Sequence, residues 1–221
     1  MRLGPPISGA FFVGYAFQVR RTWPTLTCMI RRCQRRQRLK SAMEFRTGHA
    51  SQESDICDLF ATTFSASEGQ AEGAAIGALV RELMETTPSQ DLFVWSAYEG
   101  KELIGCIFFS RLDFPQDDRT AFILSPVAVK TTHQNTGVGQ KLIAHGLDEL
   151  RRYHIDFVAT YGDPNFYAKI GFRQITKEFA SPPLDLNFPE GWLGQFLAGT
   201  YESPMIGASR CASALNKPEL W

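Results

Sequence analysis

One stretch near the middle of the chain restricts its fold more than any other. Residues 121–129 form an apolar, β-branched run, residues 130–133 connect, and residues 134–152 open with two glycines and continue with apolar residues at helical spacing. This pattern predicts a strand that enters a glycine-bearing turn and then a long helix. The first amides of such a helix have no partner within it, so the stretch also predicts an anion site beside the end of a strand.

From residue 43 onward the chain alternates between strand and helix patterns. Strands are predicted at residues 44–47, 92–98, 103–109, 121–129, 157–160 and from 172, and helices at residues 51–64, 75–84, 137–152 and 164–171. The first helix is expected to begin within Ser51–Ser54 with a hydroxyl side chain as its cap. The order β-α-α-β-β-β-α-β-α-β predicts an α/β chain whose sheet contains an antiparallel hairpin at residues 92–109.

Charge divides the chain into two parts. Residues 1–43 hold nine of the 23 Lys and Arg residues, including a block between Arg31 and Lys40, and no Asp or Glu. The other residues hold all 23 acidic side chains and carry a net charge of −9, although the whole chain is neutral. An acidic domain does not attract nucleic acid through nonspecific electrostatics, so no specific nucleic-acid partner is expected.

Folded patterning begins at Met43, and two units are expected. Residues 1–42 form a basic arm or upstream extension, and residues 43–221 form one domain with its motif core at residues 120–175. The apolar run at residues 9–19 precedes the main basic block, which is the reverse of an export signal. Three interpretations of the arm stay open: a dispensable extension with Met43 as the natural start, an Arg-rich transit peptide, and an RNA-binding arm.

Composition excludes several classes of protein. With 221 residues, 44% of them hydrophobic and 21% charged, the chain suits one sizeable core and is unlike a collagen, a coiled coil or a disordered sequence. No uninterrupted apolar run reaches the roughly 18–20 residues that a membrane helix needs. Five scattered cysteines give neither a disulfide framework nor metal-ligand spacing, and Cys57 and Cys106 lie in apolar runs that predict buried thiols. The lack of a disulfide framework favours a reducing compartment, so we expect a cytoplasmic protein. We also expect no metal and a monomer or homodimer.

Taken alone, the glycine turn is weak evidence for a ligand site. Its residues are Val127-Ala128-Val129 and Gln134-Asn135-Thr136-Gly137-Val138-Gly139-Gln140, without the spacing of a Rossmann fingerprint or a Walker loop. A second element follows, with Gly162-Asp163-Pro164 and then Tyr167-Ala168-Lys169-Ile170-Gly171-Phe172. Together they resemble the V-x-V, [QR]-x-x-G-x-[GA] and Y-x-K-x-G-F elements of the GNAT N-acetyltransferases. The likeness covers about residues 43–175 and looks most like the YhbS-like branch of that family.

The resemblance implies a fold, a cosubstrate and an activity. The fold is a mixed, mostly antiparallel sheet flanked by helices, with a V-shaped splay between the fourth and fifth strands. Acetyl-CoA would lie in the splay, its pantetheine arm held by the backbone of residues 127–129 and its pyrophosphate by the amides of residues 134–140. The activity would be N-acyl transfer to a primary amine of a small molecule or a peptide. Asn135 and Thr131 replace a glycine and a proline common in the family, and neither change removes the anion site.

The resemblance also implies a general acid. Tyr167 corresponds to the tyrosine that frequently protonates the departing CoA thiolate in this family. A phenol suits that role, because phenol and thiol pKa values differ by only about 1.5 units. The amide of Val127 would polarise the thioester carbonyl. Alternatively, Tyr167 packs structurally beside Phe166 and Phe172.

Acetyl transfer also needs a group that accepts the proton of the amine. Asp163, Glu99, His133 and Asp113 are all conceivable bases. Asp163 precedes Pro164, so capping of the short helix is an alternative role for its carboxylate. The sequence therefore places Tyr167 and Asp163 in a candidate catalytic pair and leaves the base open.

The sequence does not specify the acceptor amine. Aromatic side chains of the first two helices, the strands and the C-terminal part could line its pocket, although most such residues are core: Phe60, Phe64, Phe93, Trp95, Phe109, Phe114, Phe188, Trp192 and Phe196. An acidic loop at residues 113–119 could attract a cationic amine. Residues 176–221 contain five prolines and are expected to be irregular and to cover the acceptor side.

Two functions of other classes compete with an acetyl-CoA-dependent enzyme. One is a CoA-binding sensor that keeps the phosphate loop and lacks turnover. The other is an RNA- or membrane-associated protein that acts through its basic arm. A metalloenzyme or a serine hydrolase is disfavoured, because the sequence has no HExxH, no clustered ligands and no G-x-S-x-G.

Overall fold

The computed structural model describes residues 43–198 and 203–221, and the predicted basic arm lies outside them. Seven strands of the described residues form one sheet: β1 (Met43–Thr47), β2 (Leu92–Glu99), β3 (Glu102–Arg111), β4 (Ala121–Val129), β5 (Phe157–Tyr161), β6 (Arg173–Gln174) and β7 (Trp192–Phe196). Their order in the sheet is β1-β2-β3-β4-β5-β7-β6. Of these pairings only β4–β5 is parallel, so the predicted mixed, mostly antiparallel sheet with a β2–β3 hairpin is confirmed.

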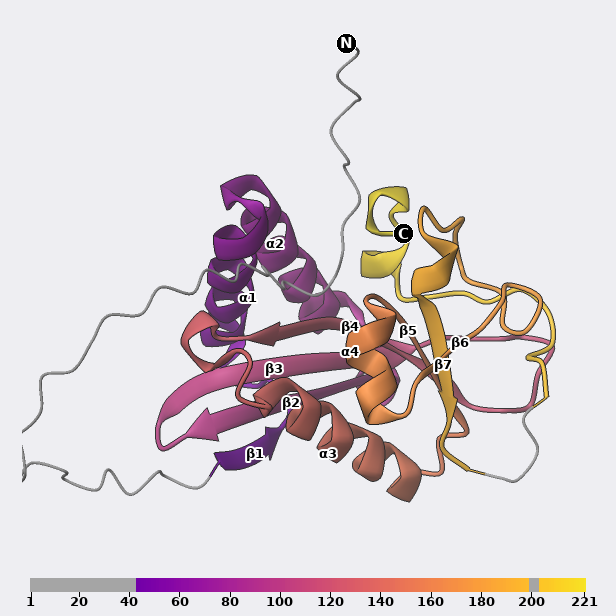
Figure 1. The fold of residues 1–221 in the computed structure, drawn as a ribbon, viewed down its shortest axis with the longest axis horizontal. Helices are drawn as coiled ribbons and strands as arrows, with labels where there is room; N and C mark the ends of the chain where they lie inside the picture. Colours follow the sequence, from indigo (N-terminus) through magenta and orange to yellow (C-terminus); the bar gives the residue numbers. More distant parts are fainter. Residues whose placement is uncertain (1–42, 199–202) are drawn as a thin grey trace, which may run out of the picture.

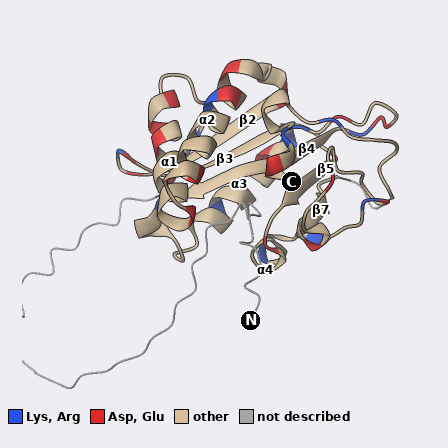
Figure 2. Cartoon of the chain, turned by 90° about the horizontal axis from the view of Figure 1, so that it is seen from above, with Lys and Arg blue, Asp and Glu red and all other residues tan. Residues whose placement is uncertain are grey.

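Helices cover both faces of the sheet (Figure 1). Helices α1 (Glu53–Glu68) and α2 (Gln70–Thr86) lie on one face, and α3 (Val138–Arg152) and α4 (Pro164–Tyr167) lie on the other. Because side chains alternate along a strand, β3 supplies Phe108 to the core under α1 and α2, and Ile107 to the core under α3. Asp and Glu residues recur along α1 and α2, in keeping with the acidic composition of residues 44–221 (Figure 2).

Close packing at a glycine fixes the position of α3. A Cβ atom on Gly146 would lie 2.8 Å from the ring of Phe109, 3.1 Å from Ile107 and 3.2 Å from Trp95. Only a residue without a side chain permits this approach of the helix to the sheet. The middle of α3 is thereby held against β2 and β3.

The predicted serine cap of the first helix is wrong. Helix α1 begins at Glu53 with Gln52 as its N-cap, and no side chain caps it. Ser51 lies before the helix with φ +66°, in the left-handed region. The side-chain carbonyl of Gln52 instead accepts a 2.6 Å hydrogen bond from the hydroxyl of Tyr98 on β2. The side chain of the N-cap residue is therefore engaged in a tertiary contact and does not cap the helix.

The prediction that residues 176–221 are irregular is wrong for one segment. Residues 192–196 form β7, which pairs with β5 on one side and with β6 on the other. Strand β7 was not predicted for two reasons. The sequence around it is rich in proline, and its hydrogen-bond partners lie far away along the chain. Strand β6 is short because it pairs with β7 only at Arg173 and Gln174.

Candidate active site

Strands β4 and β5 separate at their C-terminal ends. They pair from Ala121–Phe157 to Leu124–Thr160, after which β4 continues to Val129 without a partner on that side. At the last pair, the hydroxyl of Thr160 donates a 2.9 Å hydrogen bond to the carbonyl oxygen of Leu124. The predicted splay between the fourth and fifth strands is confirmed.

The unpaired half of β4 turns its backbone groups toward the splay. The amide of Lys130 donates to the carbonyl of Ile104 on β3, and antiparallel ladders alternate between bonded and non-bonded pairs. Val129 and Val127, opposite Gly105 and Ile107, are therefore in non-bonded pairs. Their N–H and C=O groups point away from β3, into the space that β5 has left.

The loop after β4 is held by hydrogen bonds within itself. The side-chain amide of Gln134 donates to the carbonyl of Val129 at 3.0 Å, and the hydroxyl of Thr136 donates to the carbonyl of His133 at 2.6 Å. Asn135 has φ +60° and Gly137 has φ +86°. Asparagine and glycine tolerate the left-handed region best, so these residue types fit the turn that the sequence requires.

The first turn of α3 presents free amides to this loop. The helix's first hydrogen bond runs from the amide of Lys141 to the carbonyl of Gly137 at 3.1 Å. The amides of Val138, Gly139 and Gln140 therefore have no acceptor within the helix, and the helix dipole adds positive charge at the same place. These groups suit an anion such as a diphosphate.

Gly139 brings three elements together at this point. A Cβ atom on Gly139 would lie 3.3 Å from Val129 at the end of β4 and 3.5 Å from the ring of Phe166 in α4. The start of α3 therefore lies against both β4 and α4. The two sequence elements that carry the resemblance thus meet in space.

Asp163 caps α4. Its Oδ1 accepts hydrogen bonds from the backbone amide of Asn165 at 2.9 Å and from the side-chain amide of the same residue at 3.2 Å. Pro164 occupies the first position of the helix, as its fixed φ favours. The capping role that the sequence left open for Asp163 is therefore present, and none of the described residues donates to its Oδ2.

Tyr167 ends α4 and is buried, with 1% of its surface exposed. Its ring lies edge to face with Phe166 at 5.0 Å and with Phe172 at 5.6 Å between centroids. The same core cluster contains Leu124 at the start of the splay and Val138 in the first turn of α3. The aromatic packing that the sequence suggested is thus present, on the α3 side of the splay.

Of the other candidate bases, His133 and Glu99 pair with each other, and Asp113 lies elsewhere. His133 pairs with Glu99 at 3.1 Å, between the loop before α3 and the end of β2. The backbone of Asp113 forms an isolated bridge with Arg210 beyond the end of β3. In the acidic loop, Asp117 is engaged with Arg119, which lowers the pKa of its carboxyl to about 2. Because this carboxylate is paired with Arg119, it is not available to attract an acceptor amine.

The candidate acceptor aromatics divide between the two faces. Phe60, Phe64, Phe114 and Trp192 are core residues on the side of α1 and α2. Phe93, Trp95 and Phe109 belong to the core on the α3 side, so they cannot line a pocket on the opposite face. The register of the strands decides this division, which the sequence interpretation did not make.

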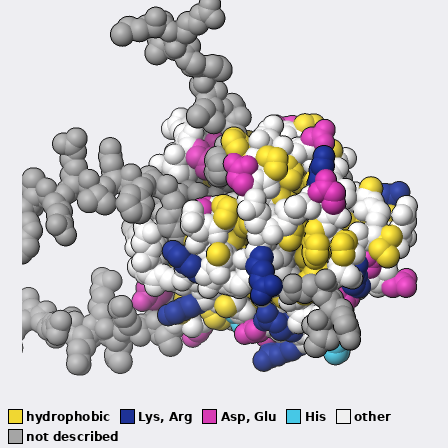
Figure 3. All heavy atoms as spheres, turned by 45° about the vertical axis from the view of Figure 1, so that its right-hand side comes forward, with side chains coloured by type: hydrophobic (Ala, Val, Ile, Leu, Met, Phe, Trp, Pro, Cys, Tyr) yellow, Lys and Arg dark blue, Asp and Glu magenta, His cyan; other side chains and the backbone are white. Residues whose placement is uncertain are grey.

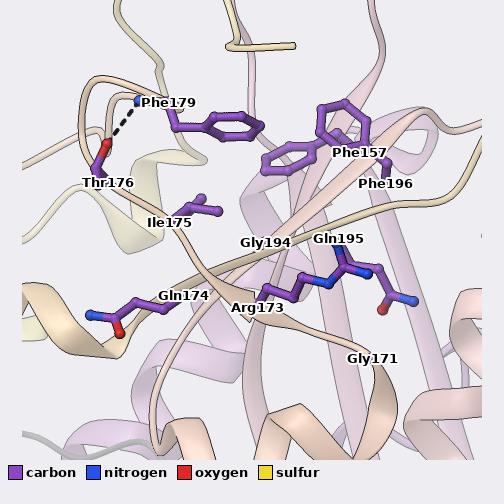
Figure 4. A pocket seen from close by; sticks show the side chains of 10 residues that line it. All are labelled: Phe157, Gly171, Arg173, Gln174, Ile175, Thr176, Phe179, Gly194, Gln195 and Phe196. Carbon is purple, nitrogen blue, oxygen red and sulfur yellow. Dashed lines mark hydrogen bonds between the residues drawn. The ribbon is translucent and has the colours of Figure 1, made fainter. Parts of the chain in front are cut away.

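A separate cavity of about 370 Å³ lies at the edge of the sheet beside β6 and β7. The rings of Phe157, Phe179 and Phe196 gather on one side of it, while Arg173 and Gln195 lie on another (Figure 4). On the exterior of this side of the molecule, hydrophobic side chains reach the surface between charged ones (Figure 3). Phe157 is the first residue of β5, so the cavity lies at the opposite end of that strand from the splay.

The described residues offer two further negative findings. No helix among them is long and apolar enough to cross a membrane. Within residues 43–198 and 203–221, no group of three His, Cys, Asp or Glu side chains could hold a metal ion. Cys57 and Cys106 are buried, as their apolar surroundings predict, and burial raises the pKa of the Cys106 thiol to about 12.

Comparison with known proteins identifies the family. A model of the acetyltransferase (GNAT) domain matches residues 90–174. The chain is 31% identical over 173 residues to the uncharacterized N-acetyltransferase YjhQ of Escherichia coli (strain K12), across 75% of this chain and 92% of YjhQ. This chain belongs to the GNAT family of N-acetyltransferases. Another GNAT relative, the uncharacterized N-acetyltransferase YhbS of the same strain, is 32% identical over 72 residues, which cover 33% of this chain and 43% of YhbS.

Solved GNAT structures share the fold. The crystal structure of Escherichia coli YhbS in complex with CoA has a TM-score of 0.66 and 22% identity, covering 79% of this chain and 92% of that protein. A GNAT acetyltransferase from Brucella melitensis in complex with acetyl-CoA has a TM-score of 0.57 and 21% identity, covering 79% of this chain and 99% of that one. The GNAT fold that the sequence resemblance implied is confirmed.

Proposed function

We propose that this GNAT enzyme transfers the acetyl group of acetyl-CoA to the nitrogen of a primary amine, and that residues 43–221 form the catalytic domain. One observation carries the proposal: β4 and β5 separate after the Leu124–Thr160 pair, directly beside the free amides at the start of α3. Relatives of the same fold have been solved with CoA and with acetyl-CoA, which supports the choice of cosubstrate.

The residues fit each part of this cosubstrate. Val127 and Val129, with Ala128 between them, offer backbone groups on the open side of β4, where an extended amide-containing arm adds like a strand. The amides from residue 134 to residue 140 surround the start of α3 and suit the pyrophosphate. A Cβ atom on Gly137 would meet nothing within 4 Å, so this position leaves room for a phosphate group.

In the proposed reaction the neutral amine attacks the thioester carbonyl carbon. The new C–N bond forms, and the C–S bond breaks after the carbonyl oxygen has carried negative charge, which the amide of Val127 stabilises. The thiolate takes the proton of the Tyr167 hydroxyl. The amine nitrogen loses a proton to Asp163, whose Oδ2 keeps a lone pair outside the helix cap.

Calorimetric titration of acetyl-CoA into the full chain tests the proposal. Gly137→Glu places bulk and negative charge in the phosphate loop, and Gly48→Glu is its matched control, because both glycines have positive φ and open space around a Cβ. We expect binding by the wild type and by Gly48→Glu, and its loss in Gly137→Glu. A folded wild type that binds no acetyl-CoA would overturn the proposed function.

A further inference from the structure

The splay has a second face, on the side of α1 and α2. Leu124 belongs to the core on the α3 side, whereas Ile123 before it and Tyr161 at the end of β5 face α1 and α2. Strand alternation places Ser125 on this second face as well. If the phosphate loop holds CoA on the α3 side, the acceptor amine reaches the thioester from the second face. The inference below therefore rests on the proposed function.

The C-terminal segment closes this second face. Two 3₁₀ turns, Ser213–Leu215 and Pro218–Leu220, lead to Trp221 on the same side of the sheet as α2 (Figure 1). Between this segment and the splay remains a cavity of about 10 Å³, lined by Ile123, Ser125, Tyr161, Leu215, Leu220 and Trp221. A cavity of roughly this size holds at most one water. Nothing as wide as an aromatic ring fits between the segment and the strands.

Specific contacts hold this wall in place. The ring of Trp221 stacks on Tyr161, with centroids 6.2 Å apart and planes at 16°, and only 4% of Trp221 is exposed. Its indole N–H donates to the carbonyl of Leu215 at 2.8 Å. Lys217 forms a 2.7 Å ion pair with Glu82 on α2. The wall is therefore a packed part of the domain.

No side chain that lines the cavity carries a charge. Its side chains are aliphatic and aromatic apart from the hydroxyl of Ser125 and the phenol of Tyr161. The Tyr161 hydroxyl accepts a 2.8 Å hydrogen bond from the amide of Phe188, and burial raises the pKa of Tyr161, so the phenol stays neutral. An uncharged aromatic wall favours an alkyl chain and does not pair with a second charge close to the reacting nitrogen.

We propose that Trp221 determines acceptor specificity by standing across the acceptor side of the splay, and that it limits the acceptor to a slender primary amine on an unbranched alkyl arm. Because the cavity holds at most one water, the acetyl group and the amine nitrogen enter only when the Trp221 and Leu220 side chains move. A branched or aromatic amine requires removal of the indole.

Binding of CoA–amine conjugates tests this without a known acceptor. In each probe the CoA sulfur is joined through an acetyl bridge to the nitrogen of ethylamine or of 2-(1-naphthyl)ethylamine. By calorimetry, the wild type should bind the ethylamine conjugate at least about tenfold more tightly than the naphthyl conjugate, a typical discrimination by pocket shape. Trp221→Ala should bring the two affinities close together, while Trp221→Phe should keep most of the difference.

The affinity for CoA alone reports folding in every variant, because its site lies on the other face of the sheet. Ile206→Ala is the matched control: Ile206 belongs to the same C-terminal part and is 57% exposed. Leu220→Ala removes a smaller piece of the wall and replaces Trp221→Ala if that variant does not fold. Equal affinity of the wild type for both conjugates, or discrimination that survives loss of the wall, would overturn the inference alone. Absence of CoA binding by the wild type would overturn the proposed function.

Discussion

The hydroxyl of Thr160 donates a 2.9 Å hydrogen bond to the carbonyl oxygen of Leu124, its neighbour in the last pair between β4 and β5. Thr160 is fully buried, so this bond replaces a water contact at the point where the strands separate. A side-chain hydrogen bond therefore joins the two strands at their last pair before the splay.

Thr160→Val keeps the shape of the side chain and removes its hydroxyl. Loss of the buried hydrogen bond should lower the free energy of unfolding by about 1–3 kcal/mol. Urea unfolding at neutral pH measures the change. Thr160→Ser keeps the hydroxyl and should be closer to the wild type; a valine variant as stable as the wild type would show that the contact contributes nothing.

Tyr167→Phe removes the proposed acid and keeps the aromatic packing with Phe166 and Phe172. We expect kcat to fall by about 10²-fold, as is typical for loss of a general acid, with little change in the affinity for acetyl-CoA. Steady-state kinetics and calorimetry separate the two effects. Phe172→Leu changes the same packing while keeping the phenol, and serves as the control. An unchanged kcat would assign protonation of the thiolate to another group.

Asp163→Asn separates the two roles of this residue. Asparagine caps helices about as well as aspartate, so α4 should persist, while the proposed base is removed. We expect kcat at neutral pH to fall with no loss of thermal stability. Asp163→Ala should lose both activity and about 1 kcal/mol of stability, through the missing cap. Full activity in Asp163→Asn would leave the carboxylate a capping role only.

The ion pair between Asp117 and Arg119 should make the stability of the folded protein depend on pH. Its side chain is 4% exposed and pairs with Arg119, whose hydrogen bonds lower the pKa of the carboxyl from 3.8 to about 2. The unfolded chain takes up this proton near pH 4 and the folded chain only near pH 2, so the pair stabilises fully above pH 4. Its contribution, about 2 kcal/mol at neutral pH, is lost as the pH falls from 4 to 2.

Urea unfolding from pH 7 to pH 2 measures that contribution. Asp117→Asn should be less stable than the wild type at pH 7, and the difference should shrink as the pH approaches 2. Asp118→Asn is the matched control, because Asp118 is the exposed neighbour. A difference that stays constant over this range would mean that the ion pair does not carry the effect.

Local patterns predicted much of the candidate site. The glycine turn at residues 134–140 needs left-handed backbone and a helix start, and Asn135 and Gly137 supply both. The cap by Asp163 involves only its own helix. Strand β7 escaped prediction, because its pairing with β5 and β6 joins segments that are distant in the sequence. The face of the sheet on which Trp95 lies also escaped prediction, because it depends on the strand register.

The sequence by itself determined the order of elements from β1 to β6, the turn that leads into α3 and the family to which the chain belongs. These depend on periodicity, glycine conformation and motif residues, all of which are local. Only the tertiary structure decided where β4 and β5 separate and which residues close the far side of the splay. Thr160, Tyr161 and Trp221 come from distant segments, and only the folded sheet brings them together.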